Sequence, residues 1–325
     1  MNYKQDLEAA GRFLRENDRF LVVNHVSPDG DATGSILAMG HMLQALGKEF
    51  VLVNEGSTPE KFLFIPHSNK IINLSEEKPD GLFDHAIALD CGDFLRVGEA
   101  ARYFTKDVQL LNVDHHPTND LFGKFNLVRT DACATAEILY DLVKEMGIPL
   151  HTGLATSLYM GLLTDTGGFR YSNTTAEVLQ KAADLLNHGV SPSEVAERCL
   201  ETITASYLRL LREVLPTLTM DFNDEAAYLT ITLEAMEVSQ ANPEDMEGIV
   251  NYARNIEGVE VGVLFKQMDP ETVKVSFRSN KKVDVSAIAK ELGGGGHAKA
   301  AGCTVKGSLP EVIEIVKNRL GQAWS

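Results

Sequence analysis

The sequence predicts an α/β protein with two domains. Short apolar runs alternate with longer segments of helical periodicity, which is typical of βαβ units and a mostly parallel sheet with helices on both faces. The 325 residues are enough for two domains of ordinary size. We therefore expect an N-terminal domain at residues 1–190, a helical linker at 191–215, and a smaller C-terminal α/β domain at 216–325.

The N-terminal domain has strand and helix patterns in the order expected of a covered parallel sheet. Gly47 marks the end of the second helix. The expected strands are residues 20–24, 49–53, 84–90 and 108–113. The expected helices are residues 6–16, 36–46, 133–146, 152–163 and 175–188.

The linker begins with a helix-start signal, in which Ser191 is the N-cap and Pro192 the first helical residue. Residues 193–215 are expected to be mostly helical, with Pro216 at their end. In the C-terminal domain the expected strands are residues 227–232, 259–265 and 272–277, and the expected helices are residues 243–255, 285–292 and 309–320.

The composition excludes several classes of protein. A net charge of −16 repels long polynucleotides, which bind mainly through phosphate neutralisation. No apolar run approaches the length of a membrane span, and residues 1–17 are polar and amphipathic rather than a signal peptide. The four cysteines form no CxxC pair, so we expect a reduced, cytoplasmic protein. A homodimer is the default expectation.

The first chemical motif follows the strand at residues 20–24. His25, Asp29 and Asp31 lie on the turn before the next helix. In an open α/β sheet such a turn lies at the carboxyl end of a strand, where ligands bind. Imidazole and carboxylate groups suit a hard or borderline divalent cation. Taken alone, the two acids are equally compatible with ordinary turn residues, with Asp31 as a helix N-cap.

Further acids and histidines follow other elements of the same domain. Asp90 ends one expected strand, and the triplet Asp114-His115-His116 follows another. Asp165 follows the helix at 152–163 and precedes two glycines, which allow close backbone approach. Separate structural roles for each residue explain this repetition poorly. The sequence therefore predicts one site at the carboxyl edge of the sheet.

The C-terminal domain contains the densest basic cluster of this acidic chain, at residues 278–282, and a run of four glycines at 293–296. Because four glycines are unfavourable in regular structure, we expect a backbone nest that donates N–H groups to an anion; a flexible linker is the alternative. The candidate substrate-binding residues are Arg278, Ser279, Asn280, Gly295, Gly296 and His297.

The candidate metal ligands are His25, Asp29, Asp31, Asp90, His115 and Asp165. Six side chains overfill a catalytic site with one metal, so we expect two divalent ions bridged by Asp90, which is central in the set. Four carboxylates balance the charge of two such ions, so the site tolerates a phosphate. Oxygen-rich ligation with imidazole favours Mn²⁺. We expect the substrate in the cleft between the domains, where Arg278 clamps its phosphate.

These motifs together resemble the DHH phosphoesterase superfamily, which is named for the triplet seen here at residues 114–116. Arg278-Ser279 and the glycine run that ends in His297 resemble the DHH-associated domain of its RecJ-like branch. The resemblance covers nearly the whole chain. The length and the lack of further modules are most similar to the stand-alone bifunctional oligoribonucleases and pAp phosphatases of the family.

The resemblance implies hydrolysis of very short RNA to mononucleotides and of adenosine 3′,5′-bisphosphate (pAp) to AMP, with a manganese pair. One metal would be held by His25, Asp29 and Asp90. The other would be held by Asp31, Asp90, His115 and Asp165. His116 would lie close to the scissile phosphate, and Asp114 would orient a histidine rather than bind metal.

Three other functions are compatible with parts of this pattern. A phosphodiesterase for linear dinucleotides such as pApA would need the same motifs. A manganese inorganic pyrophosphatase would share the N-terminal ligands but not the glycine run before His297. A nucleotide sensor would have lost ligands from the metal cluster, whereas all six candidates are present.

Overall fold

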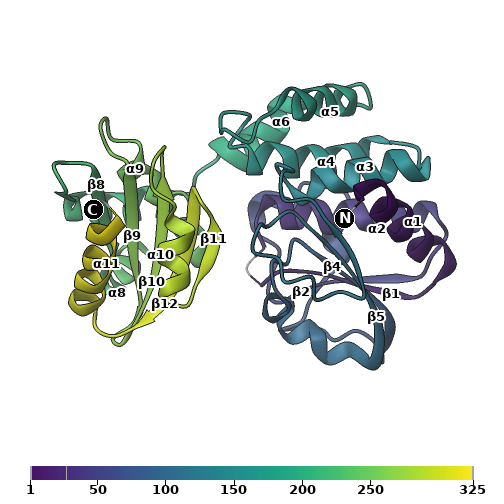
Figure 1. The fold of residues 1–325 in the computed structure, drawn as a ribbon, viewed down its shortest axis with the longest axis horizontal. Helices are drawn as coiled ribbons and strands as arrows, with labels where there is room; N and C mark the ends of the chain where they lie inside the picture. The colour runs from purple at the N-terminus through teal and green to yellow at the C-terminus, as the bar shows by residue number, and fades with distance from the viewer. Residues whose placement is uncertain (1, 27, 324–325) are drawn as a thin grey trace. The chain divides into compact units, whose positions relative to one another are not determined.

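The computed structural model describes residues 2–26 and 28–323. The chain divides into two compact units, unit 1 (Met1–Thr202) and unit 2 (Ile203–Ser325). Figure 1 shows each unit as a sheet with helices packed on it. None of the helices in the described part of the chain is long and apolar enough to cross a membrane.

Unit 1 is built on a six-stranded sheet in which all neighbouring strands are parallel. The strands are β1 (Phe20–Asn24), β2 (Phe50–Asn54), β3 (Ile71–Asn73), β4 (Phe83–Leu89), β5 (Phe104–Asp114) and β6 (Phe125–Val128). Their order is β3-β2-β1-β4-β5-β6, so the direction of winding reverses between β1 and β4. Such a reversal opens a crevice at the carboxyl ends of the two strands. The predicted α/β fold is confirmed, although β3 and β6 were missed because they are very short.

The α-helices cover one face of this sheet, and one 3₁₀ segment, η3, contributes to the other. The α-helices are α1 (Tyr3–Glu16), α2 (Gly30–Ala45), α3 (Thr135–Met146), α4 (Thr152–Asp165), α5 (Ala176–Leu186) and α6 (Pro192–Ala196). The 3₁₀ segments are η1 (Glu60–Phe62), η2 (Ser68–Lys70) and η3 (Phe94–Tyr103). A large apolar core joins the α-helices to the sheet, and Val97 and Ala100 of η3 belong to a smaller core on the opposite face. In Figure 1, α5 and α6 form an outer layer over α3 and α4.

Helix α2 begins six residues earlier than its apolar periodicity predicts. Its N-cap is Asp29, whose Oδ1 accepts the N–H groups of Asp31 and Ala32, both at 3.1 Å. The suggestion that Asp31 is the cap is therefore wrong. Residues 30–43 of the helix are all buried, so no polar face marks where it starts. Close packing also constrains the helix, because a Cβ at Gly34 would lie 2.5 Å from the Ser157 carbonyl of α4.

The segment predicted as a helical linker is helical but interrupted. After α6, which has Ser191 as its N-cap and Pro192 as its first residue as predicted, comes one π-helical turn, η4 (Glu197–Glu201). Helix α7 (Ala205–Val214) then starts afresh, with the Thr204 hydroxyl accepting the Tyr207 N–H. Pro216 lies in a final 3₁₀ turn, η5 (Leu215–Thr217).

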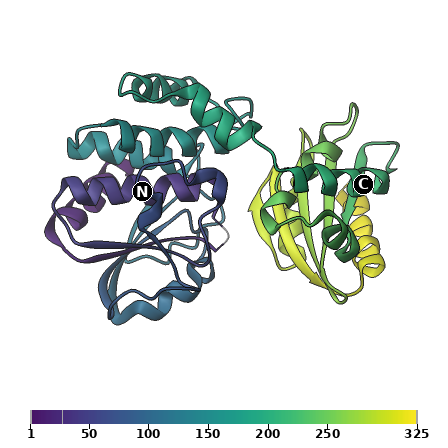
Figure 2. The same cartoon turned by 180° about the vertical axis from the view of Figure 1, so that it is seen from behind.

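Unit 2 contains a second six-stranded sheet in the order β11-β12-β10-β9-β8-β7. Its strands are β7 (Thr219–Asp221), β8 (Ala226–Ile231), β9 (Val261–Asp269), β10 (Thr272–Ser279), β11 (Gly295–His297) and β12 (Ala300–Lys306). Its helices are α8 (Leu233–Ser239), η6 (Pro243–Met246), α9 (Val250–Arg254), α10 (Val285–Glu291) and α11 (Leu309–Ala323). Helices α10 and α11 pack on one face, and α7, α8 and α9 pack on the other (Figure 2).

The glycine run does not form the expected nest along its whole length. Gly293 and Gly294 donate their N–H groups to the carbonyls of Lys290 and Ala289 and so end α10. The next two glycines belong to β11, an edge strand paired with β12. A Cβ at Gly294 would lie 2.1 Å from the Gly302 carbonyl oxygen. Close approach to β12 therefore requires glycine, and the sequence pattern did not reveal that strand.

Candidate metal centre

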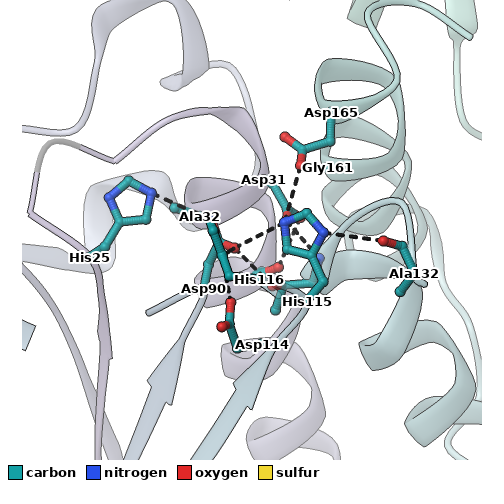
Figure 3. A network of polar contacts seen from close by, with 12 residues as sticks. His25, Asp31, Ala32, Asp90, Asp114, His115, His116, Ala132, Gly161 and Asp165 are labelled. Carbon is teal, nitrogen blue, oxygen red and sulfur yellow. Dashed lines mark hydrogen bonds and ion pairs between the residues drawn. The ribbon is translucent and has the colours of Figure 1, made fainter. Parts of the chain in front are cut away.

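The sequence-predicted ligands of unit 1 converge at the reversal of the strand order. His25 follows β1, Asp90 follows β4, and His115 follows β5. Asp29 and Asp31 lie at the start of α2, and Asp165 is the last residue of α4. Figure 3 shows Asp31, Asp90, His115 and Asp165 turned toward one another. Because β1 and β4 are neighbours in the sheet, the groups that follow β1 and those that follow β4 and β5 lie close together.

Three groups of possible ligand atoms share Asp90: one contains Asp114 and His116, and the other two consist of predicted ligands. In one, atoms of His25, Asp29 and Asp90 all lie within 4.8 Å of one another; in the other, Asp90 is joined by Asp31 and His115. The Oδ2 atom of Asp90 lies 3.4 Å from His25 Nε2, whereas its Oδ1 atom lies 3.6 Å from His115 Nε2. One carboxylate thus faces both groups, as a bridging ligand would.

Both histidines present Nε2 to the cluster. His25 donates its Nδ1–H to the Val26 carbonyl at 2.8 Å, and His115 donates its Nδ1–H to the Ala132 carbonyl at 3.2 Å. A backbone acceptor at Nδ1 fixes the tautomer in which Nε2 carries a lone pair. Burial lowers the pKa of His115, which favours the same neutral, ligating form.

Asp31 is held by the N-terminus of a helix distant in sequence. Its Oδ2 accepts the Thr135 N–H at 2.6 Å, and its Oδ1 accepts the Ala136 N–H at 2.9 Å. These N–H groups open α3, whose N-cap, Ala134, has no side-chain acceptor to offer them. The Thr135 hydroxyl also donates to Asp90 Oδ1 at 2.9 Å. The start of α3 therefore orients two acids of the cluster.

Asp90 has an unusual backbone conformation. Its φ angle is +60°, which is uncommon for a residue other than glycine and costs about 1–3 kcal/mol. Its N–H still donates to the Val113 carbonyl of β5 at 3.0 Å. Burial opposes ionisation of this carboxyl, but its contact with the His25 imidazole and the nearby His116 hold its pKa well below its usual range. Asp90 is therefore a fixed anion at the centre of the site.

Two other acids of the cluster have raised pKa values. Burial, followed by the charges of Asp90 and Asp29, raises the pKa of Asp31 well above its usual range. Burial and the charge of Asp31 raise the pKa of Asp165 in the same way. Like charges this close favour a bound cation or a proton. Imidazole nitrogens and carboxylate oxygens are suitable donors for a divalent ion, so these residues fit the predicted metal pair.

His116 is oriented by a different carboxylate. Its Nδ1–H donates to Asp114 Oδ1 at 2.8 Å, and Asn119 donates its side-chain N–H to Asp114 Oδ2 at 2.6 Å. Burial works against protonation of His116, but the Asp114 hydrogen bond and the charge of Asp90 raise its pKa to about 9. His116 therefore carries a positive charge at the edge of the cluster at neutral pH.

Two residues that orient these groups were missed at the sequence level. Thr135, the first residue of α3, and Asn119, in the loop after β5, hydrogen-bond to acids of the site, and neither belongs to a strand-end motif. Asn119 lies three residues after His116, and this closeness to the histidine pair could have suggested a role in the site. For Thr135 the sequence gives no signal, since Asp31 is 104 residues away.

The residues predicted to bind substrate lie in unit 2. Arg278 is half-buried near the end of β10, and register places it beside Ala300, which in turn pairs with His297. Ser279 is buried, and its hydroxyl donates to Glu260 Oε1 at 3.2 Å. Asn280 donates its side-chain N–H to the Arg254 and Val259 carbonyls. The Ser279 and Asn280 side chains thus bond within unit 2 itself.

Comparison with known proteins identifies the family of this chain. Residues 19–162 match the profile described as "DHH family, N-terminal domain", and residues 225–322 match the "DHHA1 domain". The chain is 38% identical over 309 residues to the Thermus thermophilus protein named "Bifunctional oligoribonuclease and PAP phosphatase NrnA", covering 93% of this chain and 90% of that one. The chain belongs to the DHH family. The resemblance inferred from the motifs is confirmed.

Solved structures support this family assignment. An exopolyphosphatase-related protein from Bacteroides fragilis superposes with a TM-score of 0.89 at 25% identity, covering 98% of this DHH-family chain and 96% of that one. RecJ from Thermus thermophilus, solved in complex with Mn²⁺, shares the fold with a TM-score of 0.54 at 16% identity, covering 98% of this chain and 53% of RecJ. Metal binding is thus recorded for a protein of the same fold.

Proposed function

We propose that this DHH-family protein is a two-metal phosphoesterase that hydrolyses very short oligoribonucleotides to mononucleotides and pAp to AMP. The observation that carries the proposal is the position of Asp90, whose two oxygens face different histidines of two overlapping ligand groups. The 38% identity to a bifunctional oligoribonuclease and PAP phosphatase supports the choice of substrates.

We assign one metal to His25, Asp29 and Asp90, and the other to Asp31, Asp90, His115 and Asp165. Asp165 Oδ2 lies 3.4 Å from His115 Nε2, which supports its inclusion in the second group. Mn²⁺ is the ion we propose. Two divalent ions at such a site activate water and neutralise charge on phosphoryl oxygens.

His116 has a distinct role in this proposal. Asp114 holds its Nδ1–H, so Nε2 is the atom left to act on a substrate. A protonated imidazole beside the cluster can donate a hydrogen bond to a phosphoryl oxygen or a proton to the leaving oxygen. Asp114 orients the ring and stabilises its positive charge.

Unit 2 would bind the remaining phosphate and the nucleoside. Arg278 shares one sheet face with Lys274, and Lys274 pairs directly with Lys266 across β10 and β9. Like charges directly opposite each other destabilise a sheet. Burial and the charges of Lys274 and Arg278 lower the pKa of Lys266 to about 8. An anionic ligand would relieve this repulsion, which supports Arg278 as a phosphate contact.

The other predicted substrate residues would act around Arg278. His297 lies in the same cross-strand row, two strands away. Edge strand β11 leaves backbone groups of Gly295 and Gly296 for a ligand. Ser279 and Asn280 would position the loop after β10 through the hydrogen bonds described above.

The proposed function is tested by product formation from four substrates with added Mn²⁺. These are pAp, a 5′-phosphorylated RNA dimer, pApA and pyrophosphate. Turnover of pAp and the RNA dimer above the other two supports the proposal. Preference for pApA would make the protein a linear-dinucleotide phosphodiesterase, and turnover of pyrophosphate alone would refute the role given to unit 2. No turnover and no retained metal would indicate a nucleotide sensor.

Two variants separate the metal site from the substrate site. Asp90→Ala should abolish turnover and reduce the bound Mn²⁺ measured by mass spectrometry of metal content, since it removes the bridge. Arg278→Ala should raise KM with both metals retained. Near-normal activity of the first variant, or metal loss in the second, would contradict these assignments.

We also propose a reducing, cytoplasmic location, because no disulfide joins the described residues and four cysteines are buried: Cys91, Cys133, Cys199 and Cys303. The predicted homodimer is a proposal that light scattering coupled to gel filtration tests directly.

A further inference from the structure

A turn of unit 1 outside the ligand motifs lies against the metal centre. After Asp90, the chain passes through a tight turn in which Asp93 Oδ1 accepts the Arg96 N–H at 3.2 Å. The Arg96 carbonyl accepts the Val26 N–H at 3.0 Å. Val26 is also the residue whose carbonyl orients His25. The backbone of Arg96 is thus fixed beside the first candidate ligand.

The two ends of this turn are fixed as well. At Gly92, a Cβ would lie 3.3 Å from His116 Cβ, so the chain passes directly along that histidine. At Gly98, where φ is +62°, a Cβ would lie 1.9 Å from Glu55 Oε2 and 2.7 Å from Val26 Cγ1. Only glycine permits this packing. The turn therefore runs from His116 to the side of β1, along the rim of the cluster.

Arg96 carries a charge that no described residue neutralises. Its side chain is half-buried, yet its guanidinium has neither an ion pair nor a hydrogen bond to any group of residues 2–26 and 28–323. By contrast, Arg129 in the same unit bonds to Glu137 and Asp141. A half-buried guanidinium normally pairs with carboxylates or phosphates, whose planar oxygens match its fork.

Arg96 starts from the rim of the metal centre. Asp93 accepts its N–H, its carbonyl accepts the Val26 N–H, and the turn that carries it passes along His116. A half-buried guanidinium at this rim favours an anion beside it, since guanidinium groups pair with carboxylates and phosphates.

We propose that the Arg96 guanidinium binds oxygens of the phosphoryl group that is hydrolysed at the metal centre. This proposal rests on the proposed function and adds a substrate contact from unit 1. Four carboxylates and two divalent ions leave no net positive charge for an incoming phosphate. Arg96 supplies that charge, and its five N–H donors in a fixed fork can bind two phosphoryl oxygens at once.

The test compares Arg96→Gln with Arg102→Gln, a matched control from the same 3₁₀ segment. Arg102 is exposed and pairs with Glu99 on the surface. In Arg96→Gln we expect kcat/KM for pAp to fall about 10- to 100-fold, the loss typical of a hydrogen bond to a charged group. The control should match the wild type.

Phosphate binding gives a second readout that does not need turnover. Isothermal titration with inorganic phosphate in the presence of Mg²⁺ should show binding at least about tenfold weaker in Arg96→Gln and unchanged in Arg102→Gln. Titration with Mn²⁺, followed by the EPR signal of the free ion, should give the same affinity in both variants and the wild type. Because phosphate binding is read directly, the result holds even if none of the four nucleotide and pyrophosphate substrates is cleaved.

Two results would overturn the proposal. Unchanged phosphate affinity and kcat/KM in Arg96→Gln would show that the side chain is only a solvated surface cation. Loss of Mn²⁺ affinity in that variant would show that Arg96 supports the metal centre and does not contact substrate. If Arg96→Gln does not fold, Arg96→Lys serves instead. It keeps the charge without the fork and should show a smaller loss of phosphate affinity.

Discussion

Replacing His41 with phenylalanine should make unit 1 less sensitive to acid. His41 lies in α2 with 4% of its surface exposed. The ring centroids of His67 and His151 lie 4.6 and 4.8 Å from its own. Its Nε2 atom is buried and has no hydrogen-bond partner in the part of the chain that the structure describes. Protonation would therefore place a buried charge there without an acceptor.

The magnitude follows from the pKa of His41. Burial, followed by the charges of His67, His151 and Lys70, lowers this pKa from 6.5 to about 4. Below pH 6.5 the unfolded chain then binds a proton that the folded chain resists, so stability is lost as the pH falls from 6.5 toward 4. At about 1.4 kcal/mol per pH unit, the loss at pH 5 comes to about 2 kcal/mol.

The assay is urea unfolding of the full-length protein, followed by far-ultraviolet circular dichroism at pH 8 and pH 5. The contributions of all other titrating groups largely cancel when His41→Phe is compared with the wild type. At pH 8 the two should differ little, because phenylalanine has a similar shape and no polar atom to bury. At pH 5 the variant should be more stable than the wild type by about 2 kcal/mol, beyond any difference between them at pH 8. An equal loss of stability in both proteins between pH 8 and pH 5 would refute the reasoning.

Three further variants test the site and unit 2. In Gly161→Ala the new Cβ would lie 2.6 Å from Asp31 Oδ1, so stability should fall by about 1–3 kcal/mol and Mn²⁺ affinity should drop in a metal titration. Thr135→Val removes the hydroxyl that orients Asp90 and should weaken Mn²⁺ binding about tenfold, with recovery in Thr135→Ser. Glu260→Ala leaves the N–H groups of residues 281–283 without their acceptor and should destabilise unit 2 by about 3 kcal/mol, measured by hydrogen exchange.

The local pattern of the chain was enough to predict much of unit 1. Each of β1, β4 and β5 is an apolar run long enough to be recognised, and each is followed by the acid or histidine of a motif. Because residues at the carboxyl ends of parallel strands share one edge, the motif positions alone predicted one site. The local pattern failed where elements are short, as in β3 and β6, or buried on every side, as at the start of α2.

The sequence by itself determined the fold class, the family and the set of side chains offered to the metals, because these depend on residue type and on distances along the chain. Only the tertiary structure decided that β1 lies beside β4, so that His25 faces Asp90. Only it placed the first N–H groups of α3 on Asp31 and made β11 from the glycine run. These contacts join residues far apart in sequence, and their formation depends on the packing of whole elements, which no local pattern records.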